Sequence, residues 1–459
     1  MVSKYLKEFE ELNTTTDSIY DLGDYEVLII LKDGTNLTSW DDMDKKNDVK
    51  YISEDLSKCT DLYEKYKGFR SVKSIVARNV TSDVRDLDGM FHGCYALVDI
   101  VGLDSWDTSN VTDMNAMFFR CKRLKDLSNL KYLNTSKVDG MRKLFSECHS
   151  LADITPLSDW DTSNVRFINC MFFDCSSLVD ISALKNWNTS NVKEMKNVFE
   201  YCSSLEDISA LADWDVSNVE YMNCMFASCE SLSNLSALSN WNITSVQSLE
   251  ETFGGCPLED LSPLANWDTS HVTSMERLFA GCKTLVNLDC LKSWNTSDLK
   301  NMKALFVGCR SLEDISVLAD WDVSNVFSMD YMFAGCTSLN DLTPLSDWNT
   351  AKLGDMDYMF VNCTSLVNLN GLENLINSNH FTMRDMFKGC SSLEDISPLS
   401  TWDICNVRYM SSIFSGCSSL TDLSPIDNWD IRRAYDKEFI FTGYPHNADY
   451  LSWYEKCEK

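Results

Sequence analysis

Apolar residues recur with a fixed spacing along most of this chain. In the segment that begins at Cys202 they stand 3, 6, 9, 12, 17, 20, 23 and 24 residues after that cysteine, and the next segment begins at Cys229. The cysteine that begins each segment returns thirteen times, with one residue lost before Cys282: Cys94, Cys121, Cys148, Cys175, Cys202, Cys229, Cys256, Cys282, Cys309, Cys336, Cys363, Cys390 and Cys417. A period of about 27 residues predicts a solenoid, in which stacked units bury an apolar face that none could bury alone.

Each unit is predicted to contain a short strand, an extended turn and a short helix. Residues 205–209 (LEDIS) suit a strand of three or four residues that pairs in parallel with the same segment of adjacent units. Val219, Met222 and Phe226 have the spacing of one to two helical turns, and Ser217 precedes them as in a capping box. The sequence therefore predicts an α/β solenoid of about 13 repeats, each a short parallel strand plus a short helix.

Three regions follow from where the repeat begins and ends. Residues 1–70 do not repeat, and their strand-like run leads into Asp33-Gly34, a hairpin signal. Residues 71–430 carry the solenoid. After Trp429 the pattern decays through residues 431–459. We expect 1–70 and 431–459 to cap the apolar ends of the stack.

Three further columns of residues recur in the repeat. Trp stands twelve residues after the cysteine in eleven units, where core packing is expected and an aromatic ligand lane is the alternative. Asp and Asn alternate at the next position through ten units. Alternation separates carboxylates otherwise about 5 Å apart and lets Asn donate to Asp, although duplication of a two-unit block would leave the same pattern. Asp also recurs five residues after the cysteine, where it is expected to accept local backbone N–H bonds, with calcium binding between units as the alternative.

Composition and charge narrow the classes of partner and the compartments that suit the protein. A net charge of −29 argues against nucleic acid and anionic membranes as partners. No run approaches the roughly 18 apolar residues of a membrane span, and no signal peptide or anchor is visible. Of 19 cysteines, thirteen hold one structural position, which predicts mostly free thiols in a reducing compartment.

No catalytic or cofactor motif accompanies the repeat. The five histidines occupy different repeat positions, and there is no CxxC, GxSxG or phosphate-binding loop. We therefore expect a protein that is not an enzyme and binds no cofactor or metal, apart from the calcium alternative.

Aromatic residues that vary between units are the candidates for a binding site. They stand 18, 19 or 22 residues after the cysteine, at Phe167, Tyr221, Phe327, Tyr331, Tyr358, Phe381 and Tyr409. Exposed rings along one face would suit a protein-binding lane. The alternative is that they fold onto neighbouring units.

The segment WDTSNVTDMNAMFFRC (106–121), together with CSSLEDIS (202–209), closely resembles the BspA-like leucine-rich-repeat surface proteins. The resemblance covers about residues 71–430. It implies a leucine-rich-repeat-type solenoid and, by association, surface display, adhesion or other protein recognition. The family's usual export and anchoring signals are not visible, so the resemblance suggests the cell surface while the free thiols suggest the cytoplasm.

The sequence therefore predicts a protein-binding module. A cation-stabilised rod and an intracellular scaffold or decoy remain alternatives, and the identity of the protein partner, the compartment and the oligomeric state stay open.

Overall fold

The computed structural model describes residues 27–40, 46–376 and 382–442. The chain forms two compact units, Met1–Asn218 and Val219–Lys459. The first unit contains the sheet, with strand order β2-β1-β3-β4-β5. Its strands are β1 (Val27–Leu31), β2 (Asn36–Leu37), β3 (Val49–Asp55), β4 (Ser74–Arg78) and β5 (Asp99–Val101).

The predicted hairpin at Asp33-Gly34 is confirmed. β1 pairs antiparallel with β2, and the N–H of Gly34, in the left-handed region at φ +86°, donates to the carbonyl oxygen of Leu31 at 3.1 Å. β3, β4 and β5 pair in parallel, so the sheet changes from antiparallel to parallel pairing where the first coils begin.

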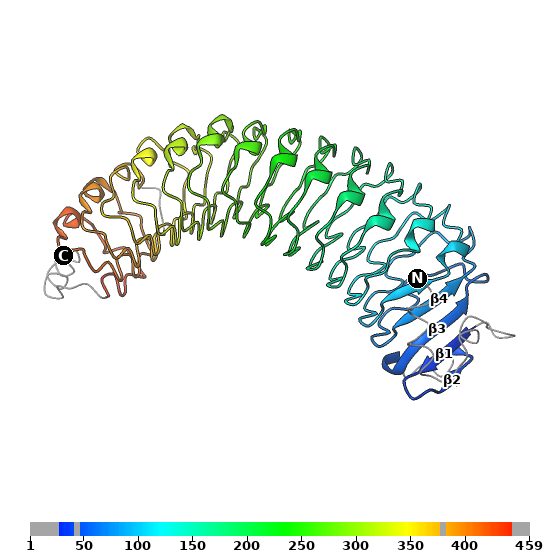
Figure 1. Ribbon diagram of the computed structural model, residues 1–459. Coiled ribbons are helices and arrows are strands. Elements are labelled where there is room, and N and C mark those ends of the chain that lie inside the picture. The colour runs from blue at the N-terminus through cyan, green and yellow to red at the C-terminus, as the bar shows by residue number, and fades with distance from the viewer. Residues whose placement is uncertain (1–26, 41–45, 377–381, 443–459) are drawn as a thin grey trace. The chain divides into compact units, whose positions relative to one another are not determined.

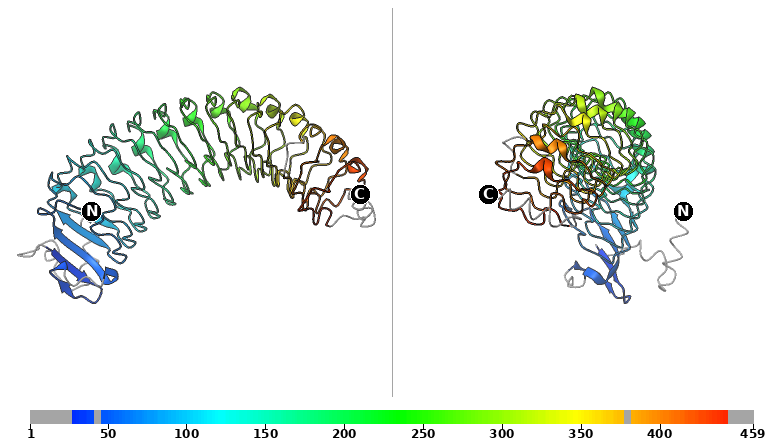
Figure 2. Two further views of the ribbon diagram at one scale, coloured as in Figure 1. Left: turned by 180° about the vertical axis from the view of Figure 1, so that it is seen from behind. Right: turned by 90° about the vertical axis from the view of Figure 1, so that its left-hand side faces the viewer.

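In both units the chain winds into coils of one repeat each, which confirms the solenoid of stacked short elements. The short 3-10 helices of successive coils lie in a row along one edge of each stack (Figures 1 and 2). In the first unit they are η2 (Leu103–Ser105), η3 (Leu130–Tyr132), η4 (Thr155–Leu157), η5 (Ser182–Leu184) and η6 (Ser209–Leu211). In the second they are η7 (Ser236–Leu238), η8 (Ser262–Leu264), η9 (Asp289–Ser293), η10 (Ser316–Asp320), η11 (Thr343–Leu345), η12 (Ser397–Thr401) and η13 (Ser424–Ile426).

The helix expected over 219–226 was placed wrongly. The corresponding segment of each coil is a run of turns, which we call the turn run, and the 3-10 helix lies earlier in the repeat. In the turn run alternate amides serve different partners. The N–H groups of Cys224, Phe226 and Ser228 donate to carbonyls of the next coil at 2.7, 3.0 and 2.6 Å. Amides between them close three-residue turns, such as Met225 to Met222 at 3.1 Å.

Left-handed backbone explains why the turn run is not helical. Two positions in each run have positive φ, as at Cys224 (56°) and Ser228 (58°). An L residue pays roughly 1–2 kcal/mol there, and such a residue interrupts an α-helix. Among the described coils the second position is glycine in eight, and glycine adopts this conformation freely: Gly68, Gly93, Gly255, Gly281, Gly308, Gly335, Gly389 and Gly416.

Parallel pairing between coils occurs at two places. The strand expected over 205–209 is not formed in that coil. At the equivalent position three pairs of described coils have a single parallel bridge, as in Asp153 with Asp180, and among the described coils only β5 is a full strand there. A second ladder of single bridges, which was not predicted, runs within each unit through the residue 19 positions after the cysteine, or 18 in the short coil, as in Asn301 with Ser328.

The core contains a column of stacked phenylalanines. In the second unit neighbouring rings from Phe226 to Phe414 lie 5.6–6.1 Å apart between centroids and within 16° of parallel. Each of these phenylalanines is at most 1% exposed. Such offset pairs contribute about 0.5–1.5 kcal/mol each beyond the area they bury, so the column holds successive coils in register.

The repeated cysteines line the same core as free thiols. Cys202 Sγ donates to the carbonyl oxygen of Phe172 in the preceding coil at 3.1 Å, and the same contact recurs along both units. All 18 described cysteines are free. Burial raises the pKa of Cys309 and Cys363 to about 12, so these thiols are protonated at neutral pH.

The tryptophan column packs in the core, as expected, and it also forms hydrogen bonds. The indole N–H of Trp214 donates to the carbonyl oxygen of Leu184, at the end of η5 in the preceding coil, at 3.0 Å. Trp402 makes the equivalent bond to Leu372 at 2.7 Å. Tryptophans with this bond join two coils, a polar role that leucine at the same position cannot fill.

The prediction that Asn donates to Asp between coils, in the column after the tryptophan, was wrong, because these side chains bond to the backbone of their own coil. Asp215 and Asn188 each accept the backbone N–H two residues further on, at 3.0 and 3.1 Å. Among the described residues no asparagine of this column donates to an aspartate of a neighbouring coil. The earlier aspartate column behaves as expected, since Asp207 accepts the N–H of Ser209 at 2.7 Å where η6 begins.

The lost residue before Cys282 is absorbed in one turn. In an ordinary coil the amide of Leu205 donates to Cys202, three residues back, at 3.0 Å. In the short coil the amide of Leu258 instead donates to Cys256, two residues back, at 2.9 Å. A tighter turn thus removes one residue, and the columns continue unchanged on both sides.

Candidate functional site

The variable side chains gather on one surface of each coil, which we call the turn face. It comprises the residues 18, 19, 21 and 22 positions after the repeat cysteine, for example Glu220, Tyr221, Asn223 and Cys224. Their backbone is fixed by the bridge ladder and by the amides that join successive turn runs. The turn face is therefore a constant backbone that presents different side chains from coil to coil.

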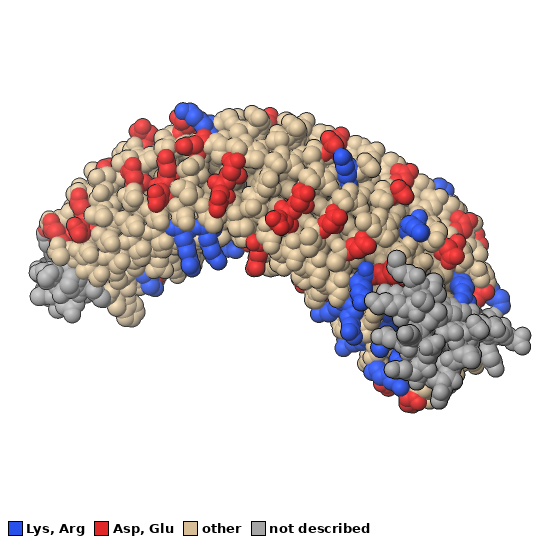
Figure 3. All heavy atoms as spheres, in the orientation of Figure 1, with Lys and Arg blue, Asp and Glu red and all other residues tan. Residues whose placement is uncertain are grey.

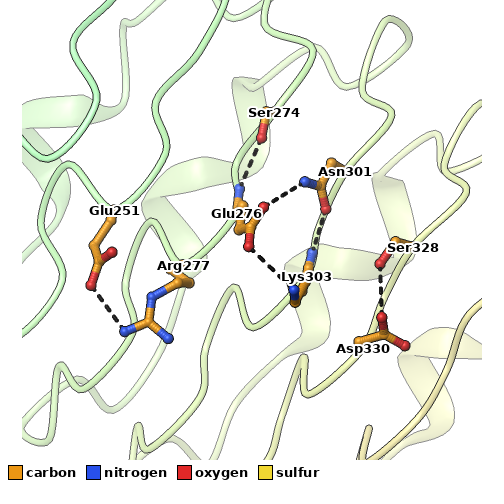
Figure 4. Close-up of polar contacts among 8 residues, drawn as sticks. All are labelled: Glu251, Ser274, Glu276, Arg277, Asn301, Lys303, Ser328 and Asp330. Carbon is orange, nitrogen blue, oxygen red and sulfur yellow. Dashed lines mark hydrogen bonds and ion pairs between the residues drawn. The ribbon is translucent and has the colours of Figure 1, made fainter. Parts of the chain in front are cut away.

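Polar side chains on the turn face connect one coil to the next (Figure 4). Asn301 donates to Glu276 at 2.9 Å and accepts the backbone N–H of Lys303 at 3.0 Å. Arg277 donates to Glu251 at 2.9 Å. These contacts support the coils laterally and hold the side chains in defined positions.

Two tyrosines of the candidate lane lie against each other. Tyr331 and Tyr358, in successive coils, stack with ring centroids 4.4 Å apart and planes within 6°. Tyr331 is 36% exposed. Both tyrosines have positive φ, a conformation imposed on this position in every coil and not one that selects tyrosine. The pair therefore forms a small aromatic plate at the surface of the second unit.

The other candidates are more widely separated. Phe327 and Tyr409, in the second unit, are 51% and 40% exposed, and Arg384 lies over the ring of Tyr409 at 4.8 Å. Phe167, in the first unit, and Tyr221 are half-buried. Phe381 lies outside the described residues. Phe327 is thus the most exposed ring of the described candidates, whereas Phe167, Tyr409 and the tyrosine pair also contact neighbouring coils.

Two exposed aromatic residues were missed in the sequence. Tyr435 and Phe439 are 81% and 65% exposed and occupy turn-face positions of the coil that begins at Cys417. The turn run continues there, since Asp436 bridges to Tyr409 and Phe441 stacks on Phe414 at 5.4 Å. Counting 18 and 22 residues from that cysteine would have found both. The part of the predicted C-terminal cap (431–459) that follows residue 442 lies outside the described residues.

Carboxylates beside the tyrosine pair repel one another. Burial is the largest cause that raises the pKa of Asp330 to about 6, and the negative charges of the nearby Asp355 and Asp357 add to it. In the first unit burial, Asp113 and Asp86 raise the pKa of Asp88 to about 6 in the same way. Negative charge thus accumulates at two places on the turn face.

No group of three or more His, Cys, Asp or Glu in the described ranges has a geometry suited to a metal ion. Within the same ranges no helix is long and apolar enough to cross a membrane. On the face that Figure 3 shows, Asp and Glu are spread over both units while Lys and Arg collect in a few groups.

Solved structures that are similar to this chain include three bacterial proteins. One is a leucine-rich repeat protein from Bacteroides ovatus, with 17% identity over 82% of this chain and 86% of that chain and a TM-score of 0.38. Another, from Eubacterium ventriosum, has 16% identity over 88% and 95% and a TM-score of 0.39. A leucine rich cell surface protein from Faecalibacterium prausnitzii has 15% identity over 76% and 83% and a TM-score of 0.35.

No curated protein matches the chain. A repeat-family model matches residues 59–180, 149–262, 249–370, 285–396 and 342–454, which together span almost the whole solenoid. This match is consistent with the repeat family that the sequence resembles. The chain belongs to the family described as "Mycoplasma protein of unknown function, DUF285".

Proposed function

We propose that this chain is a non-enzymatic protein-recognition module whose turn face contacts its partner. The observation that carries the proposal is the set of exposed rings at Phe327, Tyr331 and Tyr409 on a backbone that neighbouring coils hold rigid. Tyrosine and phenylalanine supply large contact areas with little conformational entropy to lose. Rigid aromatic anchors of this kind dominate many protein interfaces.

The arrangement of the face supports a protein ligand. The side chains differ from coil to coil while the backbone repeats, so specificity can be set by side chains alone. Charged and amide groups surround the rings, as in the polar rim of an interface. The turn face, as defined above, therefore resembles an interface in composition as well as in rigidity.

A capture experiment tests the proposal. Intact chain is compared with a variant carrying Phe327→Ala, Tyr331→Ala and Tyr409→Ala, each as purified and immobilised protein. A matched control carries Val179→Ala, Val286→Ala and Val367→Ala, which removes apolar residues that are 45–53% exposed but lie outside the turn face. We expect the aromatic variant to lose partner capture and the valine variant to retain it. Equal capture by all three proteins would refute the turn face as the binding surface.

We further propose surface display, and with it adhesion or host contact, on the basis of the repeat's resemblance to BspA-like surface proteins. Protease treatment of intact cells tests this part separately. Removal of the protein from intact cells is expected, and full protection until lysis would instead favour an intracellular scaffold.

A further inference from the structure

We propose that the first unit holds a site for a carboxylate-rich peptide segment of the partner protein. The site comprises Lys137, Arg142, Arg166 and Lys193, which we call the basic patch, together with Phe167. This inference rests on the proposed function, because it assigns the chemistry of part of the same recognition face.

The basic patch departs from the charge of the molecule. Residues 137–143, 164–170 and 191–197 cover the turn face and its approach in three successive coils. They contain six Lys or Arg and two Asp or Glu, a local net charge of 6 − 2 = +4 in a chain of −29. The cations are Lys137, Arg142, Lys143, Arg166, Lys193 and Lys196. A local cluster of cations on an acidic protein attracts anionic groups to that place.

An aromatic ring orders the arginines. The guanidinium carbon of Arg142 lies 3.7 Å from the ring centroid of Phe167, and that of Arg166 lies 5.3 Å from the same centroid. In the part of the chain that the structure describes, Arg142 and Lys193 form no ion pair, while Arg166 pairs with Asp139. A guanidinium that stacks by its face keeps the N–H groups of its edge available for a carboxylate.

A shallow hollow adjoins this stack. It is lined by Lys137, Asp139, Asn164, Arg166 and Asn191. The amide nitrogens of Asn164 and Asn191 are both anchored, since each donates to a serine carbonyl of the preceding coil at 2.7 Å. Their exposed amide groups therefore offer oxygen acceptors, next to the cationic donors of Lys137 and Arg166.

Donors and acceptors together favour a peptide over a uniform polyanion. A peptide brings backbone N–H groups for the asparagine oxygens and carboxylates for Arg142 and Lys193. A densely sulfated or phosphorylated polymer would meet Asp139 and Glu194 in the same strip, as well as the negative charge of the whole chain. The chemistry of the site thus fits an acidic segment with ordinary backbone spacing between its charges.

Titration of the full chain with a fluorescent Asp/Glu-rich peptide tests the inference. The comparison peptide has each Asp and Glu replaced by Asn and Gln. We expect the acidic peptide to bind the intact chain, the amide peptide to bind at least tenfold more weakly, and affinity to fall as salt rises. Arg142→Gln with Arg166→Gln should weaken binding of the acidic peptide at least tenfold, and Phe167→Leu should weaken it less. Lys283→Gln with Lys292→Gln removes the same charge from exposed lysines elsewhere and should leave binding unchanged.

Equal loss in the lysine control would overturn the site, because it would reduce binding to net charge. Equal affinity for the amide peptide would overturn the ligand class. Heparin binding that depends on Arg142 and Arg166, with no peptide binding, would reassign the site to an acidic polysaccharide. If peptide binding fails while capture still depends on Phe327, Tyr331 and Tyr409, only this inference falls and the recognition face stands.

Discussion

The repeated cysteines should resist alkylation in the folded protein. Each of the thirteen repeated cysteines, which we call the ladder cysteines, is at most 1% exposed, and thiols such as those of Cys336 and Cys363 donate to a carbonyl of the preceding coil. Burial raises the pKa of Cys309, Cys363 and Cys417 from 9.0 to about 12. A thiol whose pKa is about 12 in place of 9.0 has a thiolate fraction about a thousandfold lower at pH 8, and steric protection adds to this.

The assay is alkylation of native protein by iodoacetamide at pH 8, followed by peptide mapping, with N-acetylcysteine as a free reference thiol. We expect the ladder cysteines to react at least a thousandfold more slowly than the reference. Partly exposed cysteines outside the ladder should react much faster, and these are Cys59, Cys170, Cys224, Cys290 and Cys405. In denaturant the two classes should become equal. Ladder cysteines that react in native protein as fast as Cys405 would refute their place in the core.

Three further predictions concern stability, each measured by chemical denaturation. Trp214→Phe should lower the free energy of unfolding by about 1 kcal/mol more than Trp321→Phe does. The reason is that the indole N–H of Trp214 donates to the preceding coil, whereas that of Trp321 has no partner among the described residues. Equal losses would contradict the bond. Gly371→Ala should lower the free energy of unfolding by about 3 kcal/mol or more, because φ is +101° and the new Cβ would lie 2.1 Å from a carbonyl oxygen. Gly354→Ala should lower it by less than about 1 kcal/mol. Asp330 has a folded pKa of about 6, above the unfolded value, so it binds more protons when folded and its contribution to stability falls as pH rises from about 4 to 6. The free energy of unfolding of the Asp330→Asn variant, relative to that of the unchanged chain, should therefore be about 1 kcal/mol higher at pH 7 than at pH 4.5, allowing for partial exposure of the carboxyl group. An unchanged pH profile would contradict this.

The columns of the solenoid could be predicted because each repeats many times. The cysteine, tryptophan and phenylalanine positions recur through the chain, and burial in every described coil keeps them apolar, with leucine in place of tryptophan at Leu133 and Leu375. The local role of the aspartate before each 3-10 helix also followed from its chemistry. Repetition thus made architecture and core readable without any structure.

The helix over 219–226 was predicted wrongly because apolar spacing alone does not define backbone hydrogen bonding. Met222, Met225 and Phe226 point inward at helix-like intervals, yet the amides between them bond to the next coil. Positive φ at Cys224 and Ser228 separates the two structures, and neither residue type signals it. The glycine that recurs before the cysteine in other coils was the available clue.

The candidate site was only partly readable. Aromatic residues at Phe327 and Tyr409 were placed correctly on the surface, because turn-face positions lie outside the apolar pattern. The stacking of Tyr331 on Tyr358 and of Arg142 on Phe167 depends on contacts between coils. These require the register of one turn run against the next, which the sequence does not specify by itself.

Footprinting by hydroxyl radicals tests the recognition surface most directly. Side-chain oxidation is measured in the free chain and in the complex with its captured partner, residue by residue. We predict protection of Phe327, Tyr331 and Tyr409 on the turn face, with unchanged oxidation of the exposed Val286 and Val367 elsewhere on the same unit. Protection of the valines with undiminished oxidation of the three aromatic residues would contradict the account.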